Sequence, residues 1–177
     1  MNEVLTEDAK ILFKDLCAKY PYGIRGQVYL KVPRVIDWHL VDKEIVVEVK
    51  LLGIQGESLI VSAVDENGSV VDLDSCSFED IRKYGTVESY EITCFNFKPY
   101  LRPISSMTRE ELKELRDIFN NIIDFDEWGL DILNSDFKRF SYLELLAIFD
   151  WFNKHHFDYG GLIEKGLAFE APDGMYN

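Results

Sequence analysis

The stretch SYLELLAIFDWFNKHHFDYGG, from Ser141 to Gly161, is the most apolar segment of the chain and contains two of its three histidines. Ser141 and Glu144 form a capping box, in which each side chain bonds a free backbone N–H group at a helix start. The apolar side chains that follow point nearly all round the helical cylinder, which is typical of a buried helix. The Gly160-Gly161 pair can adopt the left-handed backbone that ends helices. We therefore predict a buried helix that ends near His155–Phe157.

The sequence before this helix changes from helical to strand periodicity. Residues 6–19 have apolar side chains at helical spacing, with Thr6 as the N-cap, and predict a first helix. Between residues 23 and 97, short segments alternate polar and apolar side chains, and Asn67-Gly68 favours a hairpin turn. The predicted strands are Gln27–Val32, Glu44–Leu52, Ser58–Val64, Ser69–Leu73 and Glu88–Phe95. We expect an α+β fold with an N-terminal helix and a small antiparallel, β-barrel-like sheet of the SH3-like or OB-like kind.

A segment with two prolines separates these strands from the C-terminal helices. Lys98–Thr108 contains Pro99 and Pro103, which lack backbone donors, so it predicts an irregular connector. Thr108 and Glu111 then form a second capping box at the start of a helix. The predicted organisation is a helix plus β-barrel-like region at 1–97, a connector at 98–108, and a helical C-terminal subdomain at 109–177 packed on the first.

Composition and charge exclude several classes of protein. The 177 residues contain 19 basic and 32 acidic side chains, which gives a net charge of −13 without a basic patch. Direct binding to nucleic acid needs clustered Lys and Arg and is therefore disfavoured. The three cysteines include no C-x-x-C pair, so neither a zinc nor a redox motif is indicated. No apolar run has transmembrane length and no signal peptide is evident, so we expect a cytoplasmic protein.

The cluster that most resembles a binding or acid–base site is His155, His156, Asp158 and the neighbouring Tyr159. Adjacent histidines on a helix point about 100° apart and do not easily chelate one metal ion, so we predict no metal or other cofactor. A structural explanation competes with a functional one. Histidines at a helix C-terminus interact with the helix dipole, and Asp158 would then cap the next turn. Asp150, one turn before Lys154, is explained by an ion pair between them.

Three stretches of sequence carry a resemblance to known sequences. They are DLCAKYPYG at Asp15–Gly23, KPYLRPISSMT at Lys98–Thr108 and DWFNKHHFDYGGLIEKGLAFEAPDGM at Asp150–Met175. Together they resemble an uncharacterised family of hypothetical proteins from gut Bacteroidetes, their phages and mobile elements. Where that family commonly has Arg after the Tyr, this chain has Gly160, which argues against an arginine-based site there. The resemblance implies a phage or prophage setting, and no particular activity.

These observations favour a non-enzymatic binding module. We predict a phage- or prophage-associated accessory or host-manipulation protein in the cytoplasm of a bacterial host, with a protein partner such as a host defence component. One alternative is a protein that sequesters a small molecule or nucleotide, which needs a concave pocket with convergent polar groups. Another is a hydrolase that uses His155, His156 and Asp158, which requires these side chains to line one pocket. The sequence leaves the oligomeric state open.

Overall fold

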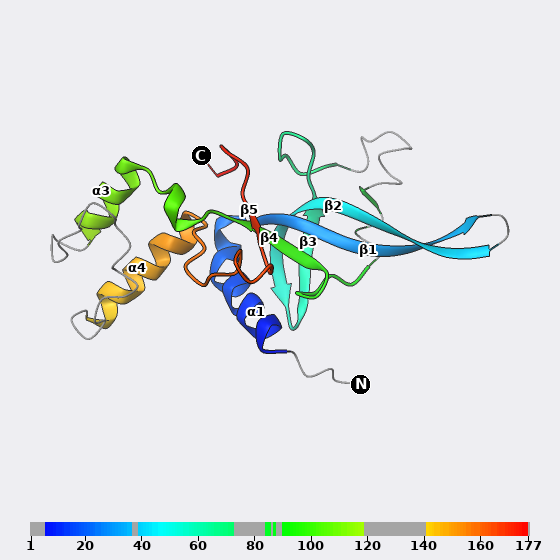
Figure 1. The fold of residues 1–177 in the computed structure, drawn as a ribbon, viewed down its shortest axis with the longest axis horizontal. Coiled ribbons are helices and arrows are strands. Elements are labelled where there is room, and N and C mark those ends of the chain that lie inside the picture. Colours follow the sequence, from blue (N-terminus) through cyan, green and yellow to red (C-terminus); the bar gives the residue numbers. More distant parts are fainter. Residues whose placement is uncertain are drawn as a thin grey trace.

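The computed structural model describes residues 6–36, 39–72, 84–85, 87, 90–118 and 141–176. The α+β fold is confirmed, with the sheet running across the molecule, α1 on one side of it and α3 and α4 at one end (Figure 1). The elements in chain order are α1 (Glu7–Lys19), the 3-10 turn η1 (Tyr20–Tyr22), β1 (Arg25–Ile36), β2 (His39–Gln55), β3 (Ser58–Ala63), β4 (Phe97–Leu101), the 3-10 turn η3 (Ile104–Ser106), α3 (Arg109–Ile118), α4 (Tyr142–Lys154) and β5 (Phe169–Glu170).

The sheet has the strand order β3-β2-β1-β4-β5 and is antiparallel except between β4 and β5. Within the described residues it is open rather than a closed barrel. One backbone hydrogen bond of 2.7 Å, from Leu59 N–H to the Ile92 carbonyl, links the edge strand β3 to the segment before β4. The SH3-like or OB-like assignment therefore stays a prediction. Of the predicted strand at Ser69–Leu73, the described part forms a single bridge, between Val70 and Val64.

The predicted N-terminal helix is confirmed as α1. The Thr6 hydroxyl accepts a hydrogen bond from Ala9 N–H at 3.2 Å, so the N-cap works as the sequence predicts. The apolar side of α1 packs on the inner face of the sheet, because helical spacing aligns these side chains in one stripe. The main core consists of Ala9, Leu12, Leu16, Ile24, Val28, Leu30, Val47, Val49, Leu51, Leu59, Ala63, Val87, Ile92, Cys94, Phe97, Leu101, Leu162 and Ala168.

Strand β4 begins where the sequence predicts an irregular connector, so that prediction is wrong for Lys98–Leu101. Pro99 pairs with Gly26 at the last position of the β1–β4 ladder, where a missing N–H interrupts no further pair. Gly26 also lets β4 approach closely. A Cβ atom there would lie 2.6 Å from the Phe97 ring and closer still to the Lys98 carbonyl oxygen. Strand pairing thus overrides the local effect of the proline.

Helices α3 and α4 build a second, smaller core. The predicted capping box of α3 is confirmed, with Glu111 N–H 3.2 Å from Thr108 Oγ1 and Thr108 N–H 2.8 Å from Glu111 Oε2. The buried residues of this core are Leu115, Ile148, Trp151, Phe152 and Phe157. After it, the chain returns to the main core at Leu162 and Ala168. The predicted domain boundaries stay a prediction, since the C-terminal region contributes to both cores.

Two expectations for α4 are wrong, although its capping box is confirmed. The helix is not buried all round, because Tyr142 and Leu143 are 73% and 75% exposed and burial begins only where α4 packs on α3 and α1. Asp150 accepts a hydrogen bond from the Tyr22 hydroxyl, and no ion pair joins it to Lys154, which is also described. The turn η1 lies against α4 and supplies this partner. The described residues do not include Cys76 or the acidic segment Asp124–Asp136, for which the sequence predicts a loop or short helix. None of the described helices is long and apolar enough to cross a membrane.

Candidate binding site

The end of α4 carries the predicted site residues and has a Schellman geometry. Phe157 N–H donates to the Phe152 carbonyl at 3.0 Å and His156 N–H to the Asn153 carbonyl at 3.1 Å. The ring centroids of Phe152 and Phe157 lie 6.1 Å apart, which supplies the apolar contact of this motif. The left-handed residue is His156, with φ 58°, so the prediction that Gly160-Gly161 ends the helix is wrong. Histidine tolerates this backbone better than most residues.

His156 occupies the left-handed position because its side chain is anchored in the interior. The imidazole is 4% exposed and stacks on Tyr176 at a centroid distance of 3.9 Å. Burial, and after it the nearby charge of Lys19, lower the pKa of His156 to about 4. The ring is therefore neutral near pH 7. Nδ1 has no hydrogen-bond partner among the described residues.

His155 lies in separate surroundings, on the α3 side of the same turn. Its ring stacks on Trp151 at 4.3 Å, and its Nδ1 is 3.4 Å from Glu111 Oε1. The side chain is 22% exposed. The side chains of the two adjacent histidines therefore contact different residues.

Asp158 and Tyr159 also have structural partners. Both carboxylate oxygens of Asp158 accept hydrogen bonds at 2.8 Å, from Leu162 N–H and Ile163 N–H, so Asp158 caps the following turn. The Tyr159 hydroxyl donates to Asn153 Oδ1 at 2.8 Å, and burial raises the pKa of Tyr159 to about 12. The four predicted residues share one loop, but their side chains do not converge.

A buried ion pair lies next to this loop, and sequence reasoning did not identify it. Lys19 is fully buried and donates to Asp15, one turn earlier in α1. The Lys19 ammonium also lies 4.3 Å from the centroid of the Tyr159 ring. Burial lowers the pKa of Lys19 and raises that of Asp15, against their mutual attraction. The i,i+4 spacing in α1 is the sequence signal for the pair, but spacing does not reveal burial.

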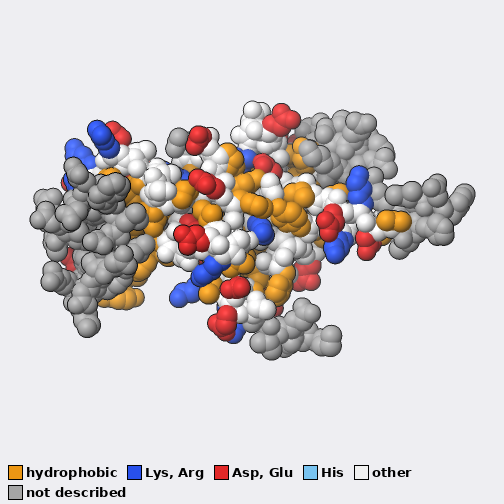
Figure 2. Space-filling model, in the orientation of Figure 1, with side chains coloured by type: hydrophobic (Ala, Val, Ile, Leu, Met, Phe, Trp, Pro, Cys, Tyr) orange, Lys and Arg blue, Asp and Glu red, His pale blue; other side chains and the backbone are white. Residues whose placement is uncertain are grey.

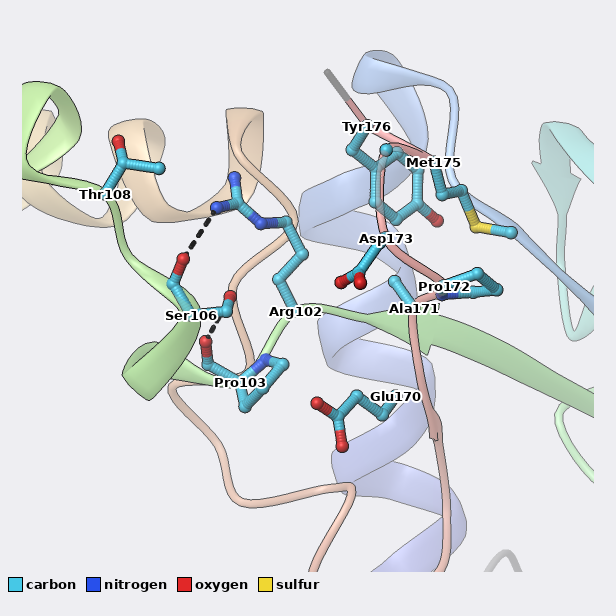
Figure 3. Close-up of a pocket in the computed structure, with 11 residues that line it drawn as sticks. Arg102, Pro103, Ser106, Thr108, Glu170, Ala171, Pro172, Asp173, Met175 and Tyr176 are labelled. Carbon is cyan, nitrogen blue, oxygen red and sulfur yellow. Dashed lines mark hydrogen bonds between the residues drawn. The ribbon is translucent and has the colours of Figure 1, made fainter.

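A pocket of about 260 Å³ lies between the η3 turn and the C-terminal segment (Figure 3). Figure 3 shows Glu170 and Asp173 reaching from that segment toward the gap. The pocket is lined by Arg102, Pro103, Ser106, Thr108, Glu170, Ala171, Pro172, Asp173, Gly174, Met175 and Tyr176. None of the four predicted site residues lines it, so this pocket gives the hydrolase alternative no support.

Arg102 is the basic side chain that lines this pocket, and it already forms an ion pair. The Arg102 guanidinium forks onto Glu111, with N–O distances of 2.6 and 2.9 Å, and lies 4.4 Å from the centroid of the Phe157 ring. Burial alone would raise the pKa of Glu111, but hydrogen bonds from Arg102 and Thr108 outweigh it and lower the pKa to about 2. Glu170 and Asp173 then dominate the charge of the pocket, which disfavours the phosphates of a nucleotide. No group of three His, Cys, Asp or Glu in the described part of the chain is placed to hold a metal ion.

A second surface feature is an arm formed by β1 and β2. The two strands pair continuously from Arg25↔Lys50 to Ile36↔His39. Strand β4 pairs with β1 only at residues 26–28, and β3 pairs with β2 from residue 49 onward. In the described chain, residues 31–36 and 39–44 thus pair only with each other, and Figure 1 shows them extending away from the helices. We call these residues the arm.

The arm and its base expose apolar side chains. Val41 is 45% exposed in the arm, and Tyr29 and Val46 are 39% and 47% exposed at its base. The predicted strand Gln27–Val32 continues through Pro33 to Ile36. The β-branched residues after Pro33 were the signal that the strand continues.

Comparisons with known proteins add no identification. No family model, no curated protein and no solved structure matches this chain.

Proposed function

We propose that this chain is a non-enzymatic binding module that contacts a protein partner through the arm. The observation that carries the proposal is that the arm pairs only with itself in the described chain. A two-stranded ribbon is marginally stable in water on its own. A long ribbon with exposed apolar side chains is therefore expected to gain contacts in a complex.

The charge of the arm favours a protein partner over a nucleic acid. Residues 31–44 contain three basic side chains, Lys31, Arg34 and Lys43, and three acidic ones, so their net charge is 3 − 3 = 0 in a chain of net charge −13. Acidic and basic side chains are interspersed on the face shown in Figure 2. Binding to a phosphate backbone would need a concentration of basic residues instead. An arm with zero net charge and exposed apolar side chains is better suited to a protein surface.

The biological setting of the proposal rests on the sequence resemblance of residues 98–108 and 150–175. On that basis we propose a phage or prophage setting, in which the chain acts as an accessory protein in the cytoplasm of a bacterial host. The partner is then a protein of that host, such as a defence component, or another phage protein.

The test is a variant with a shortened arm. Residues 31–44 are replaced by Asn-Gly, which removes the arm and connects the paired residues Leu30 and Ile45 with a two-residue turn. Wild type and variant are used to capture proteins from an extract of the bacterial host, and the binding of each purified candidate is then measured by calorimetry. We expect the variant to lose the partner while its melting temperature changes by only a few degrees, because the arm contributes little to either core.

A matched pair of point variants refines the test. Val41→Glu places a charge on the arm, whereas Ile60→Glu places one on β3, at a residue that is 48% exposed and outside the arm. V41E should weaken binding at least about tenfold, as expected for loss of more than about 1.4 kcal/mol of apolar contact, and I60E should leave it unchanged. A shortened-arm variant that binds the same partner as tightly as wild type would show that the proposed function is wrong.

A further inference from the structure

We propose that the free edge of β2, at Asp42 and Glu44 in the arm and Val46 at its base, accepts an antiparallel strand from the partner, in which basic and apolar residues alternate. The inference rests on the proposed function of the arm and specifies the mode of binding and the chemistry of the partner. Strand addition to a sheet edge combines main-chain hydrogen bonds with side-chain specificity.

The direction of each backbone group in β2 follows from two hydrogen bonds. The Glu48 carbonyl accepts from Val64 N–H at 3.0 Å, on the β3 side, and Leu51 N–H donates to the Ile24 carbonyl at 2.9 Å, toward β1. Backbone groups of an antiparallel strand alternate between its two neighbours. Even-numbered residues of β2 before the bulge at Leu51/Gly53 therefore point away from β1. The N–H and C=O groups of residues 42, 44 and 46 are consequently unpaired within the described chain.

The opposite edge of the arm is blocked. Tyr29 N–H donates to the Asn96 carbonyl at 2.8 Å, so odd-numbered residues of β1 direct their backbone groups away from β2. Pro33 occupies one of these outward positions, opposite Asp42, and has no N–H to offer an added strand. Proline on an edge strand is a known device against strand addition. The arm is therefore open along β2 and closed at the middle of β1.

The side chains along the open edge define the partner. Asp42, Glu44 and Val46 lie on one face of β2, and Asp42 and Glu44 are exposed and form no ion pair with another described residue. The next acid on this face, Glu48, is already paired with Arg25 at 3.2 Å. Basic side chains directly across from Asp42 and Glu44 would stabilise the added strand.

The other face of the same edge favours apolar side chains in the alternate positions. It presents Val41 and Ile45, on either side of Lys43. A second copy of this chain is a poor occupant, because its own β2 edge would place acidic residues against Asp42 and Glu44, and like charges across strands are destabilising.

The probes are two peptides with the sequence acetyl-Lys-Val-Lys-Val-Lys-Val-amide. In the proposed antiparallel register the lysines face Asp42 and Glu44, so the lysine N–H groups bond β2 and the valine N–H groups point outward. A peptide N-methylated at its valines keeps the ladder, and a peptide N-methylated at its lysines cannot form it. The two have the same charge and apolar surface.

The measurement is amide hydrogen exchange of the full chain by NMR. With the valine-methylated peptide, we expect exchange at residues 42, 44 and 46 to slow by about tenfold or more. Exchange at residues 41, 43 and 45 should not change, because these amides already bond β1. The lysine-methylated peptide should have no effect. Glu44→Pro, which removes one outward N–H, should abolish the response, whereas the charge control Glu44→Gln should only weaken it.

Three results would overturn the inference. They are equal responses to both peptides, equal slowing at odd and even residues, or protection at the even residues in the absence of peptide together with a dimeric mass by light scattering. The last result would identify a second copy as the occupant. If the shortened-arm variant loses its partner and the peptides still fail, the arm binds by another mode and only the strand-addition inference is wrong.

Discussion

Burial of His156 should make the stability of the fold depend on pH in a way that one substitution can isolate. The folded pKa of this imidazole is about 4, below the ordinary histidine value of 6.5, because burial and Lys19 disfavour its charged form. Between these values the unfolded chain binds a proton that the folded chain does not. Stability is thus fully present above pH 6.5 and is lost as the pH falls toward 4.

The magnitude follows from the same two pKa values. The difference between 6.5 and about 4 corresponds to about 3 kcal/mol, at 1.36 kcal/mol per pKa unit. A side chain that is 4% exposed has little water around it to reduce this effect. A loss of about 3 kcal/mol is a large part of the 5–15 kcal/mol that typically stabilises a domain.

The variant His156→Asn removes the titrating group and keeps a side chain that tolerates positive φ. Urea unfolding of wild type and H156N, followed by tryptophan fluorescence from about pH 7.5 to about pH 4, gives the difference in their free energies of unfolding. We expect wild type to lose about 3 kcal/mol relative to H156N across this range. Other titrating groups are common to both proteins and cancel.

His155→Asn is the matched control, because it changes the adjacent and partly exposed imidazole. H155N should retain the loss of stability that H156N abolishes. A difference between wild type and H156N that stays constant with pH would refute the reasoning, and so would a pH-dependent loss that disappears in H155N instead.

Two further predictions concern contacts that join distant parts of the sheet. Gly26→Ala should destabilise the fold by about 1–3 kcal/mol or more, because the added Cβ would overlap β4. The control Gly53→Ala, whose Cβ would lie 3.6 Å from Ile60, should change the free energy of unfolding by less than about 1 kcal/mol. Urea unfolding midpoints compare the two variants, and equal effects would contradict the close approach of β4 to Gly26. Tyr176→Phe should cost about 1–3 kcal/mol, because its hydroxyl accepts from Arg25 N–H at 3.1 Å and donates to the Tyr100 carbonyl at 2.9 Å. The exposed Tyr142→Phe is its control, and a Y176F variant as stable as Y142F would show that these bonds contribute nothing.

The helix starts could be predicted from the sequence because their causes are local. Thr6, Ser141 and the Thr108–Glu111 pair each bond backbone groups within one turn, and all three caps are present. The cap formed by Asp158 was also foreseen, as the structural explanation of a candidate site residue. Such contacts depend on spacing along the chain, which a sequence displays directly.

Prolines obscure the arm and β4 in the sequence, because the effect of a proline on a strand depends on which way its nitrogen points. Pro33 and Pro99 are both usual strand breakers, yet the nitrogen of Pro33 points to the outer side of β1, where no described strand pairs, and Pro99 ends a ladder opposite Gly26. The position of His156 was equally hidden. Its side chain stacks on Tyr176, a residue far along the chain, whereas the helix pattern predicted a glycine at the left-handed position.

The single proline in the middle of β1 also limits how many molecules the arm can join. A ribbon with two open edges is a repeating unit, since each added copy presents a fresh edge and growth continues into a fibre. With Pro33 on one side, the ribbon has one acceptor edge and no matching donor edge. Pairing at β2 therefore ends after one addition, and the expected complex is a discrete one-to-one assembly. Pro33, which makes this strand difficult to predict from the sequence, thus prevents the exposed arm from polymerising.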